Sequence, residues 1–371
     1  MNFDYLKQNS KLKKLASFGN DAEQLVYSRP YLSGTSSRQA LEYLVKLIYA
    51  SKIDNKDGKT IFDMVSDQRF VDYINDDCIM NSIHYVRKMG NVAVHRGELT
   101  SDEALKVLEN LHFFIGEIMV SFGLFSDYPE FVAPERAKKP AQPVQPKKEK
   151  VVVEPEVIAE FAQKMRKTHF DTAHNRDENE NKKLFLQASL RESGWKIVNV
   201  PNQNMPCCAS LNCVINDNGD VIDFILYGRD NKPLAIIEET ETKKNPVLGR
   251  KKANRVAEEL EKKYGYKPVV YYTDGYHIYC IDQLGYAPRR VFDFHTIDEL
   301  ELLKLRRTMR TDLSDPQIDD NITNRDYQKN AIRAVCSAFS AHRRHSLIVM
   351  ATGTGKTRVS ISAVDVLMRS N

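Results

Sequence analysis

The chain has 371 residues, 42% of them hydrophobic and 28% charged, which is ordinary for folded domains and long enough for two or three of them. No apolar run reaches the length of about 18 residues that crosses a bilayer, and the N-terminus has no apolar core of signal-peptide type, so a membrane protein is excluded and a cytoplasmic location is expected. The net charge of +4 gives only weak support for a polyanionic partner, and the six cysteines are spaced neither as a disulfide framework nor as a zinc knuckle.

The first predicted elements are helices, which together indicate a compact helical bundle over residues 1–127. The segments 36–52 and 101–125 carry apolar residues three and four positions apart, the spacing that places them on one face of a helix. The second of these helices is expected to start after Thr100. Residues 128–155 then change character, because they hold six prolines and a cluster of lysines. Such a composition builds no core and favours an extended chain, so this segment is predicted to be a linker.

Residues 156–310 show a mixed pattern that predicts an α/β domain with a central mixed sheet. Short apolar runs bounded by turn residues are typical of strands in such a sheet. A helix is expected first, then three strands, then a second helix and two further strands. These elements are predicted at residues 182–193, 195–200, 221–228, 233–240, 249–265, 267–274 and 276–282.

Residues 322–371 hold one helix, an apolar strand at 346–350, a glycine loop and another helix. A lone strand–loop–helix cannot bury its faces, so the chain is expected to be the N-terminal part of a longer protein. The fold class predicted for the whole chain is therefore multidomain, α and α/β, with a helical bundle, a mixed-sheet domain and the beginning of a phosphate-loop domain.

The glycine loop, ATGTGKTR, follows an apolar run and opens a helix, which is the context in which such a loop binds nucleotide phosphates. Neither Met350 nor Ala351 is the glycine with which the strict phosphate loop begins, so this is the variant found in helicases. Its backbone is expected to turn inward around the phosphates, its lysine to reach the β- and γ-phosphates, and the threonine after that lysine to hold Mg²⁺ with ATP. The residues predicted to bind ATP here are Gly353, Thr354, Gly355, Lys356 and Thr357.

Two residues upstream of the loop are predicted to contact the base of ATP. Arg325 and Gln328 lie in the sequence RDYQ, and Gln328 precedes Lys356 by 28 residues. In helicases a glutamine or arginine at such a place contacts the adenine edge. The sequence shows no downstream strand of the DExH type and no second motor lobe with an arginine finger, so useful hydrolysis of ATP is not expected from this chain.

A pair of carboxylates marks the predicted sheet. Asp223 begins one predicted strand and Glu238 closes the next, 15 residues later. A turn at 228–232 would bring both to neighbouring strand ends, where two carboxylates bind one or two Mg²⁺ through hard oxygen ligands. Such a metal polarises a scissile phosphate and activates water, so both residues are predicted as catalytic metal ligands of a nuclease. The alternative is a β-hairpin with ordinary surface acids.

Nuclease sites of this kind have a lysine two residues after the Glu, on the same side of the strand. That position is Thr240 here, and its hydroxyl supplies neither charge nor much basicity. Losing such a group typically costs about 10²–10⁴ in rate. The candidate substitutes are Lys243 and Lys244 beyond the strand, and Lys182 and Lys183 in the preceding helix.

The order of these parts resembles the N-terminal region of the motor (R) subunit of type I restriction enzymes over nearly the whole chain. GDVIDFILYGRDNKPLAIIE resembles that family's nuclease strands, and NRDYQKNAIRAV and VMATGTGKTR resemble the adenine and phosphate motifs of its superfamily 2 translocase. The resemblance implies a restriction-endonuclease-like domain at 156–310 and the start of a RecA-like helicase lobe at 322–371. It also implies Mg²⁺-dependent cleavage of double-stranded DNA, ATP-driven translocation by the complete protein, and methylation and specificity subunits as partners.

Several positions depart from that family. Its Glu-x-Lys stands here as Glu238-Glu239-Thr240, and its Gln-x-x-x-Tyr in the next helix corresponds to Lys252 and Val256. The two carboxylates carry over, whereas the family's Lys, Gln and Tyr do not. The alternative hypothesis is a helicase-like ATPase whose inactive nuclease fold only binds DNA.

A second pattern lies in the helical segment, where HYVRKMGNVAVHRGE contains Arg87, Asn91 and His95. An arginine followed by a histidine, with a polar residue between them, resembles HEPN-type ribonucleases, in which both act on an RNA 2′-hydroxyl and the phosphate. The step of eight residues between them is longer than the usual one, and Gly90-Asn91 is predicted to form a tight turn. The other hypotheses are a bundle that docks protein or nucleic acid, and a plain scaffold.

Overall fold

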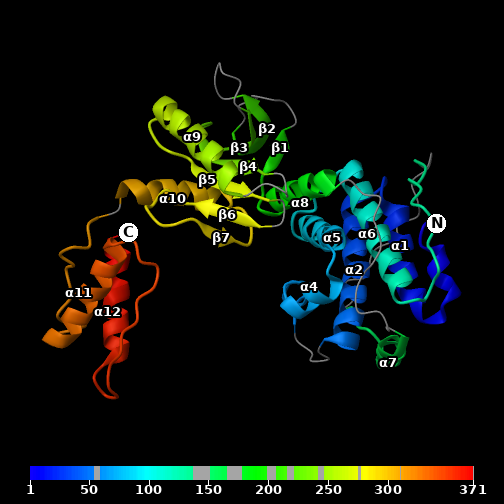
Figure 1. Cartoon of the computed structure of the whole chain (residues 1–371), viewed down its shortest axis with the longest axis horizontal. Helices are drawn as coiled ribbons and strands as arrows, with labels where there is room; N and C mark the ends of the chain where they lie inside the picture. The colour runs from blue at the N-terminus through cyan, green and yellow to red at the C-terminus, as the bar shows by residue number, and fades with distance from the viewer. Residues whose placement is uncertain are drawn as a thin grey trace. The chain divides into compact units, whose positions relative to one another are not determined.

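The computed structural model of the chain contains two compact units, Met1–Glu192 and Ser193–Asn371 (Figure 1). The residues that it describes are 1–53, 59–136, 151–164, 178–198, 206–214, 221–240, 246–274, 277–309 and 311–370. None of the helices within these ranges is long and apolar enough to cross a membrane.

The first unit is helical, as the spacing of its apolar residues predicts. Its elements are η1 (Asp4–Gln8), η2 (Ser10–Leu12), α1 (Lys13–Leu25), α2 (Pro30–Lys52), α3 (Ile61–Val65), α4 (Gln68–Ile74), α5 (Asp77–Arg96), α6 (Ser101–Ser121), α7 (Pro155–Lys164) and α8 (Glu178–Glu192). The long helices α2, α5 and α6 pack against one another and supply most of the core. Burial of their apolar faces is the main force that holds this unit together.

Two places in α5 and α6 show how local sequence and packing set the helices. The Thr100 side chain accepts a hydrogen bond from the Glu103 N–H, and the Glu103 side chain accepts one from the Thr100 N–H, so a capping box starts α6 where the sequence predicts. Gly90-Asn91, in contrast, forms no turn, because both residues lie inside α5; the predicted turn is wrong. A Cβ at Gly90 would lie 2.7 Å from the Cβ of Arg38 in α2, so the glycine permits close approach of two helices rather than a bend.

The ends of the proline-rich segment pack on the first unit. Val151 is 5% exposed, and its carbonyl oxygen accepts a hydrogen bond from Lys46 Nζ at 2.8 Å. α7 adds Val157 and Phe161 to the same core. The middle of the predicted linker, residues 137–150, lies outside the described residues. The predicted domain bounds stay predictions, whereas the contacts group α7 and α8 with the bundle.

The described residues of the second unit form a seven-stranded mixed sheet in the order β1-β2-β3-β4-β5-β6-β7. Its strands are β1 (Lys196–Val198), β2 (Cys208–Val214), β3 (Val221–Tyr227), β4 (Pro233–Glu239), β5 (Val269–Thr273), β6 (Ile278–Ile281) and β7 (Arg289–Val291). β1 with β2 and β4 with β5 are parallel pairs, and the other neighbours are antiparallel. β2 and β7 are additional to the predicted strands. β2 contains Asn212 at a φ of 48°, which interrupts a regular alternation, and β7 has only three residues, two of them arginines.

α9 (Pro246–Tyr264) lies against β4 and β5 of this sheet (Figure 1). Its buried residues Ala253, Val256 and Ala257 recur at helical spacing and pack with Ile236 of β4 in one apolar cluster. α10 (Ile297–Met309) follows β7. The packing of α9 fixes where its first turn meets the end of β4.

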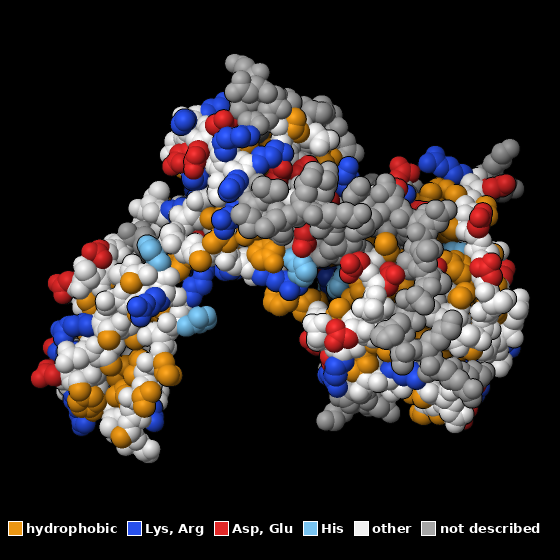
Figure 2. Space-filling view, viewed as in Figure 1, with side chains coloured by type: hydrophobic (Ala, Val, Ile, Leu, Met, Phe, Trp, Pro, Cys, Tyr) orange, Lys and Arg blue, Asp and Glu red, His pale blue; other side chains and the backbone are white. Residues whose placement is uncertain are grey.

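Residues 311–370 contain two helices, α11 (Asp326–Ser340) and α12 (Lys356–Arg369), which share a small core that includes Ile332 and Val359. The predicted strand at 346–350 is not formed, and Leu347 and Val349 are 88% and 86% exposed. A strand needs a neighbour for its backbone hydrogen bonds, and none of the described strands pairs with this segment. Figure 2 shows hydrophobic side chains at the surface over α11 and α12.

Candidate functional site

The structure brings the two predicted carboxylates together at one end of the sheet. β3 and β4 are antiparallel, with Phe224 opposite Ile237, so the next residues along, Asp223 and Glu238, stand opposite each other where the pairing ends. The Asp223 carboxylate accepts a hydrogen bond from the backbone N–H of Glu239 at 2.7 Å. Because side chains alternate along a strand, both carboxylates lie on the same face as the apolar residues that α9 covers.

Burial sets the electrostatics of this pair. Glu238 is 5% exposed and ends a run of six buried residues in β4. Burial raises the pKa of Glu238 to about 7, while the hydrogen bond from Lys252 opposes this rise and the charge of Asp223 adds to it. Glu238 Oε2 is buried and accepts no hydrogen bond from a described N–H or O–H group, while the contact of its carboxyl group with that of Asp223 also raises the pKa of Glu238. A buried carboxylate with such an oxygen gains free energy when a cation binds it.

An amine from α9 completes this arrangement. Lys252 Nζ lies 2.5 Å from Oε1 of Glu238. The Lys252 side chain is 37% exposed and that of Glu238 is 7% exposed, so the ammonium group lies between solvent and the buried carboxylate. Among the described residues, the site therefore combines two acids from the sheet with one base from a helix.

Thr240, at the position of the expected lysine, faces the first turn of α9. Its side chain is 7% exposed, and its backbone N–H donates to the Thr273 carbonyl oxygen at 2.8 Å. A Cβ at Gly249 would lie only 2.2 Å from Thr240 Oγ1. The helix backbone thus fills the space into which a longer side chain at position 240 would extend.

Among the described residues of the second unit, the lysine that contacts the carboxylate pair is Lys252, which was not among the substitutes considered from the sequence. Lys182 belongs to α8 in the first unit and is 1% exposed, and Lys183 lies beside it at the helix surface. Lys243 and Lys244 lie outside the described residues. The sequence marked Lys252 only as the counterpart of the glutamine in the family's helix motif, and only the docking of α9 reveals how near it lies to Glu238. The signal that could have found it is that motif position, which the resemblance associates with the nuclease site and which holds a basic residue in this chain.

The site offers a divalent cation two carboxylate ligands. Among the described residues, no group of three or more His, Cys, Asp or Glu side chains is placed to hold a metal ion. Asp223 and Glu238 would hold Mg²⁺ with backbone oxygens and water completing its shell, which suits a hard cation that keeps several waters. Among the described residues, two carboxylates beside one bonded ammonium group are a donor set that fits such a cation.

The phosphate loop has the backbone that its glycines predict. Gly353 and Gly355 have φ values of 80° and 87°, in the left-handed region that glycine adopts without strain. Lys356 begins α12, and its Nζ donates to the Met350 carbonyl oxygen at 2.9 Å. Thr357 follows, exposed in the first helical turn. The lysine is therefore bonded to the backbone of its own loop, at the N-terminus of a helix where anions are favoured.

The two residues predicted to contact adenine lie against this loop. Gln328 is 4% exposed, and its Nε2 donates to the Thr354 carbonyl oxygen at 2.8 Å. The Tyr327 hydroxyl donates to the same oxygen at 2.9 Å and accepts a hydrogen bond from Arg325 Nη1 at 3.2 Å. The structure thus brings Arg325 and Gln328 to the phosphate loop, with Tyr327 as the link for the first of them.

The residues of the ribonuclease pattern are not assembled into a pair. Asn91 Nδ2 donates to Oε1 of Glu192 at 2.6 Å, Arg87 Nη1 lies 3.4 Å from the same atom, and Lys88 Nζ donates to Oε2 at 3.0 Å. His95 is exposed in the last turn of α5. A step of eight residues on one continuous helix separates it from Arg87 by about 12 Å along the axis. Arg87 and Asn91 therefore hold the end of α8, and the arginine and histidine do not converge on one substrate atom.

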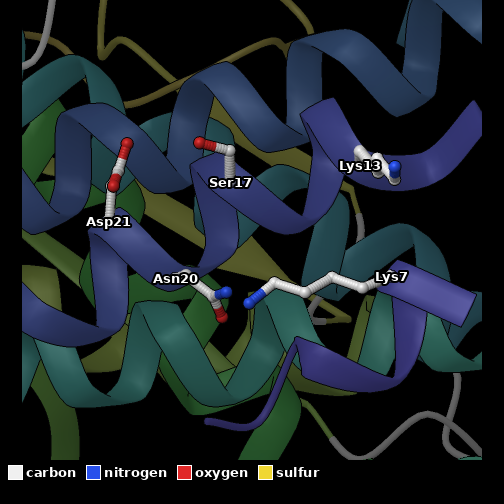
Figure 3. Close-up of a pocket in the computed structure, with 5 residues that line it drawn as sticks. All are labelled: Lys7, Lys13, Ser17, Asn20 and Asp21. Carbon is white, nitrogen blue, oxygen red and sulfur yellow. The ribbon is translucent and has the colours of Figure 1, made fainter. Parts of the chain in front are cut away.

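A cavity of about 380 Å³ lies in the first unit and is lined by Lys7, Lys13, Ser17, Asn20 and Asp21 (Figure 3). Lys7 extends toward Asn20 in this view. None of the residues predicted to form a site lines the cavity. Its side chains are ordinary for a solvated surface, so we assign it no chemistry.

Two comparisons with known proteins give a match, one with a family model and one with a solved structure. Residues 321–371 match the family model described as "Type III restriction enzyme, res subunit". A solved fragment described as an HsdR subunit of a type I restriction enzyme from Vibrio vulnificus YJ016 matches with a TM-score of 0.29 and 23% sequence identity, over 52% of this chain and 38% of that chain. No curated protein matches the chain. The family match covers the whole phosphate loop and both adenine-motif residues.

Proposed function

We propose that this chain is part of the motor subunit of a type I restriction system, and that its second unit cuts double-stranded DNA in a Mg²⁺-dependent reaction. The observation that carries the proposal is the meeting of Asp223 and Glu238 at neighbouring strand ends beside an ammonium group. The match of residues 321–371 to a restriction-enzyme family model supports it. In this proposal the sheet unit is restriction-endonuclease-like, and residues 322–371 begin a RecA-like translocase lobe.

The residues of the site suit hydrolysis of a phosphodiester. Mg²⁺ held by the two carboxylates would polarise the phosphate and lower the pKa of a bound water. Glu238 is carried by a strand that is paired on both sides, by β3 and by β5, and Asp223 is oriented by the Glu239 N–H. Both ligands are therefore held in place before a substrate arrives, which avoids reorganisation during the reaction.

Residues 322–371 would bind ATP in the same protein. Lys356 would exchange the Met350 carbonyl oxygen for the β- and γ-phosphates, and Thr357 would hold the Mg²⁺ that accompanies ATP. Gln328 and Arg325, which lie against the loop, would contact the base. ATP-driven translocation, the methylation and specificity subunits as partners, and a cytoplasmic location belong to this proposal for the complete protein.

Nicking of supercoiled plasmid with Mg²⁺ or Mn²⁺ tests the nuclease. Asp223→Asn keeps the shape of the side chain and an oxygen for the Glu239 N–H but removes the charge, so we expect nicking to fall about 10²–10⁴-fold. Asp230→Asn is the matched control, because Asp230 is an acid of the same unit whose side chain is 45% exposed and pairs with Lys304. Equal nicking by Asp223→Asn and the unmodified chain would refute the proposed site. Metal binding without nicking would favour the alternative, a nuclease fold that only binds DNA.

A further inference from the structure

We propose that Lys252 is a catalytic residue of this nuclease site, and that α9 supplies through it the ammonium group that β4 does not carry at Thr240. This inference rests on the proposed function and adds a residue to the same site. It is carried by the 2.5 Å contact between Lys252 Nζ and Glu238 Oε1. It also rests on the packing that excludes a long side chain from position 240.

The geometry of α9 explains how a helix residue reaches the strand end. Gly249, Ala253 and Val256 are all buried and form the line along which α9 contacts the sheet. Lys252 lies one turn after Gly249 and beside this line, because residues three or four positions apart are neighbours on a helix surface. Its long apolar stem can follow the edge of the contact while its charged end turns toward the carboxylates. A phosphate would contact the ammonium group where it lies beside Glu238, whichever element of the chain carries that group.

The charges around Lys252 leave room for a metal ion as well. Lys252 bonds one oxygen of Glu238, and the other oxygen accepts no hydrogen bond from a described N–H or O–H group, although the carboxyl group of Glu238 contacts that of Asp223. Asp223 lies on the same face and adds a second acid. A lysine that served only to neutralise a buried acid would need one carboxylate beside it, and the second acid would have no role. Two acids beside one exposed ammonium group instead match a site that holds a cation and a phosphate together.

The step assigned to Lys252 is stabilisation of charge. The oxygen of a water molecule bonds to phosphorus while the bond from phosphorus to the leaving sugar oxygen breaks. The proton of that water passes to bulk solvent, and the leaving oxygen takes a proton from solvent. Lys252 stays protonated throughout, and its N–H groups donate to the phosphate oxygens, on which negative charge rises in the transition state.

The test compares the full chain with Lys252→Ala, Lys251→Ala and Asp223→Asn in two assays. One assay is plasmid nicking with Mn²⁺, and the other is Mn²⁺ binding measured by isothermal titration calorimetry. Lys252→Ala is expected to lower the nicking rate about 10²–10⁴-fold, and to keep or increase the affinity for Mn²⁺ because it removes a competing cation from Glu238. Lys251, the exposed neighbour on the same helical turn, is the matched control, and its variant is expected to equal the unmodified chain in both assays.

A purely structural role for Lys252 predicts a different pattern, in which Lys252→Ala loses nicking and Mn²⁺ binding together. That pattern overturns the proposal, as does nicking by Lys252→Ala at the unmodified rate or faster; faster nicking would mean that the ammonium group occupies the place of the metal. Absence of nicking by the unmodified chain also overturns it. If the unmodified chain does not nick but binds Mn²⁺ more tightly than Asp223→Asn, the proposed metal site still stands. If the two bind Mn²⁺ equally, the proposed function is refuted as well.

Discussion

The carboxylate site and the phosphate loop of the second unit present opposite combinations of motif and structure. At the carboxylate site the sequence motif is broken at Thr240, yet two acids and an amine converge within hydrogen-bond distance. At the phosphate loop the motif is intact, yet the segment before it forms no strand and Lys356 bonds to its own loop. A motif thus specifies which chemistry is available, whereas neighbouring backbone decides whether the groups are assembled.

The neighbours of each site give the physical reason. β4 is paired with β3 on one side and β5 on the other, and α9 covers one of its faces, so the position of Glu238 is fixed from three directions. Residues 346–350 have no such support among the described residues, and their apolar side chains remain at the surface. Backbone groups without a sheet partner bond to water instead of to a strand.

The largest expected effect comes from removing the charge of Glu238. Glu238→Gln keeps the size of the side chain but cannot hold Mg²⁺ as a carboxylate does, so nicking should fall about 10²–10⁴-fold. Glu261→Gln, at an exposed position of α9, is the control and should nick normally. If Glu238→Gln nicks as fast as this control, the convergence of groups at the strand end has no catalytic meaning, and the contrast with the phosphate loop disappears.

The next effect tests whether α9 really touches the strand end. Gly249→Ala places a Cβ 2.2 Å from Thr240 Oγ1, and overpacking of this kind costs about 1–3 kcal/mol of unfolding free energy. In a Thr240→Ala background the nearest remaining contact at that residue is 3.5 Å, so the same change should cost almost nothing. Urea unfolding of the four proteins measures this coupling. Additive losses would show that the helix and the strand end are not in contact.

A smaller effect is the pH dependence of stability in the first unit, which carries neither site. It must be known before a pH profile of nicking can be attributed to the site. Burial, and then the charges of Arg87 and Lys88, lower the pKa of His84 to about 3. Between this value and the usual pKa near 6.5 the unfolded chain binds a proton that the folded chain does not, so stability falls as the pH drops below about 6.5, by at most ~1.4 kcal/mol per pH unit. Denaturant unfolding at pH 7 and pH 5 should show this loss, and His84→Gln should reduce it. If that variant lost as much stability between pH 7 and pH 5, the pH dependence would come from other groups.

The smallest expected effect concerns the phosphate loop. Gln328→Ala removes the hydrogen bond to the Thr354 carbonyl oxygen. Such a bond contributes about 1 kcal/mol, so the affinity for an ATP analogue should fall several-fold. Gln317→Ala, at an exposed position of the same segment, is the control. Fluorescence titration with a labelled nucleotide would separate the two. Equal affinities would mean that the contact holds the loop only when no nucleotide is bound.

The sequence predicts those features that depend on neighbours along the chain. The 15-residue spacing of Asp223 and Glu238, with a turn between them, was enough to predict that they meet. Features that depend on the approach of distant segments were out of reach. Lys252 comes to the site because α9 docks on β4, and Gly90 serves the close approach of α2 to α5 and not a turn. The spacing of residues in the sequence does not show how closely α9 approaches β4 or α2 approaches α5.

The placement of Lys252 on α9 has a consequence for control of the site. A lysine on the strand of its glutamate moves with that glutamate, because one stretch of backbone carries both. Here the amine and the acids belong to different elements, joined through a 2.5 Å contact and the packing of one helical face. Fraying of the first two turns of α9, which include Lys252, would withdraw the amine and leave Asp223 and Glu238, the proposed metal ligands, in place. In the proposed nuclease, any event that docks or releases the start of this helix would then switch cleavage without loss of metal.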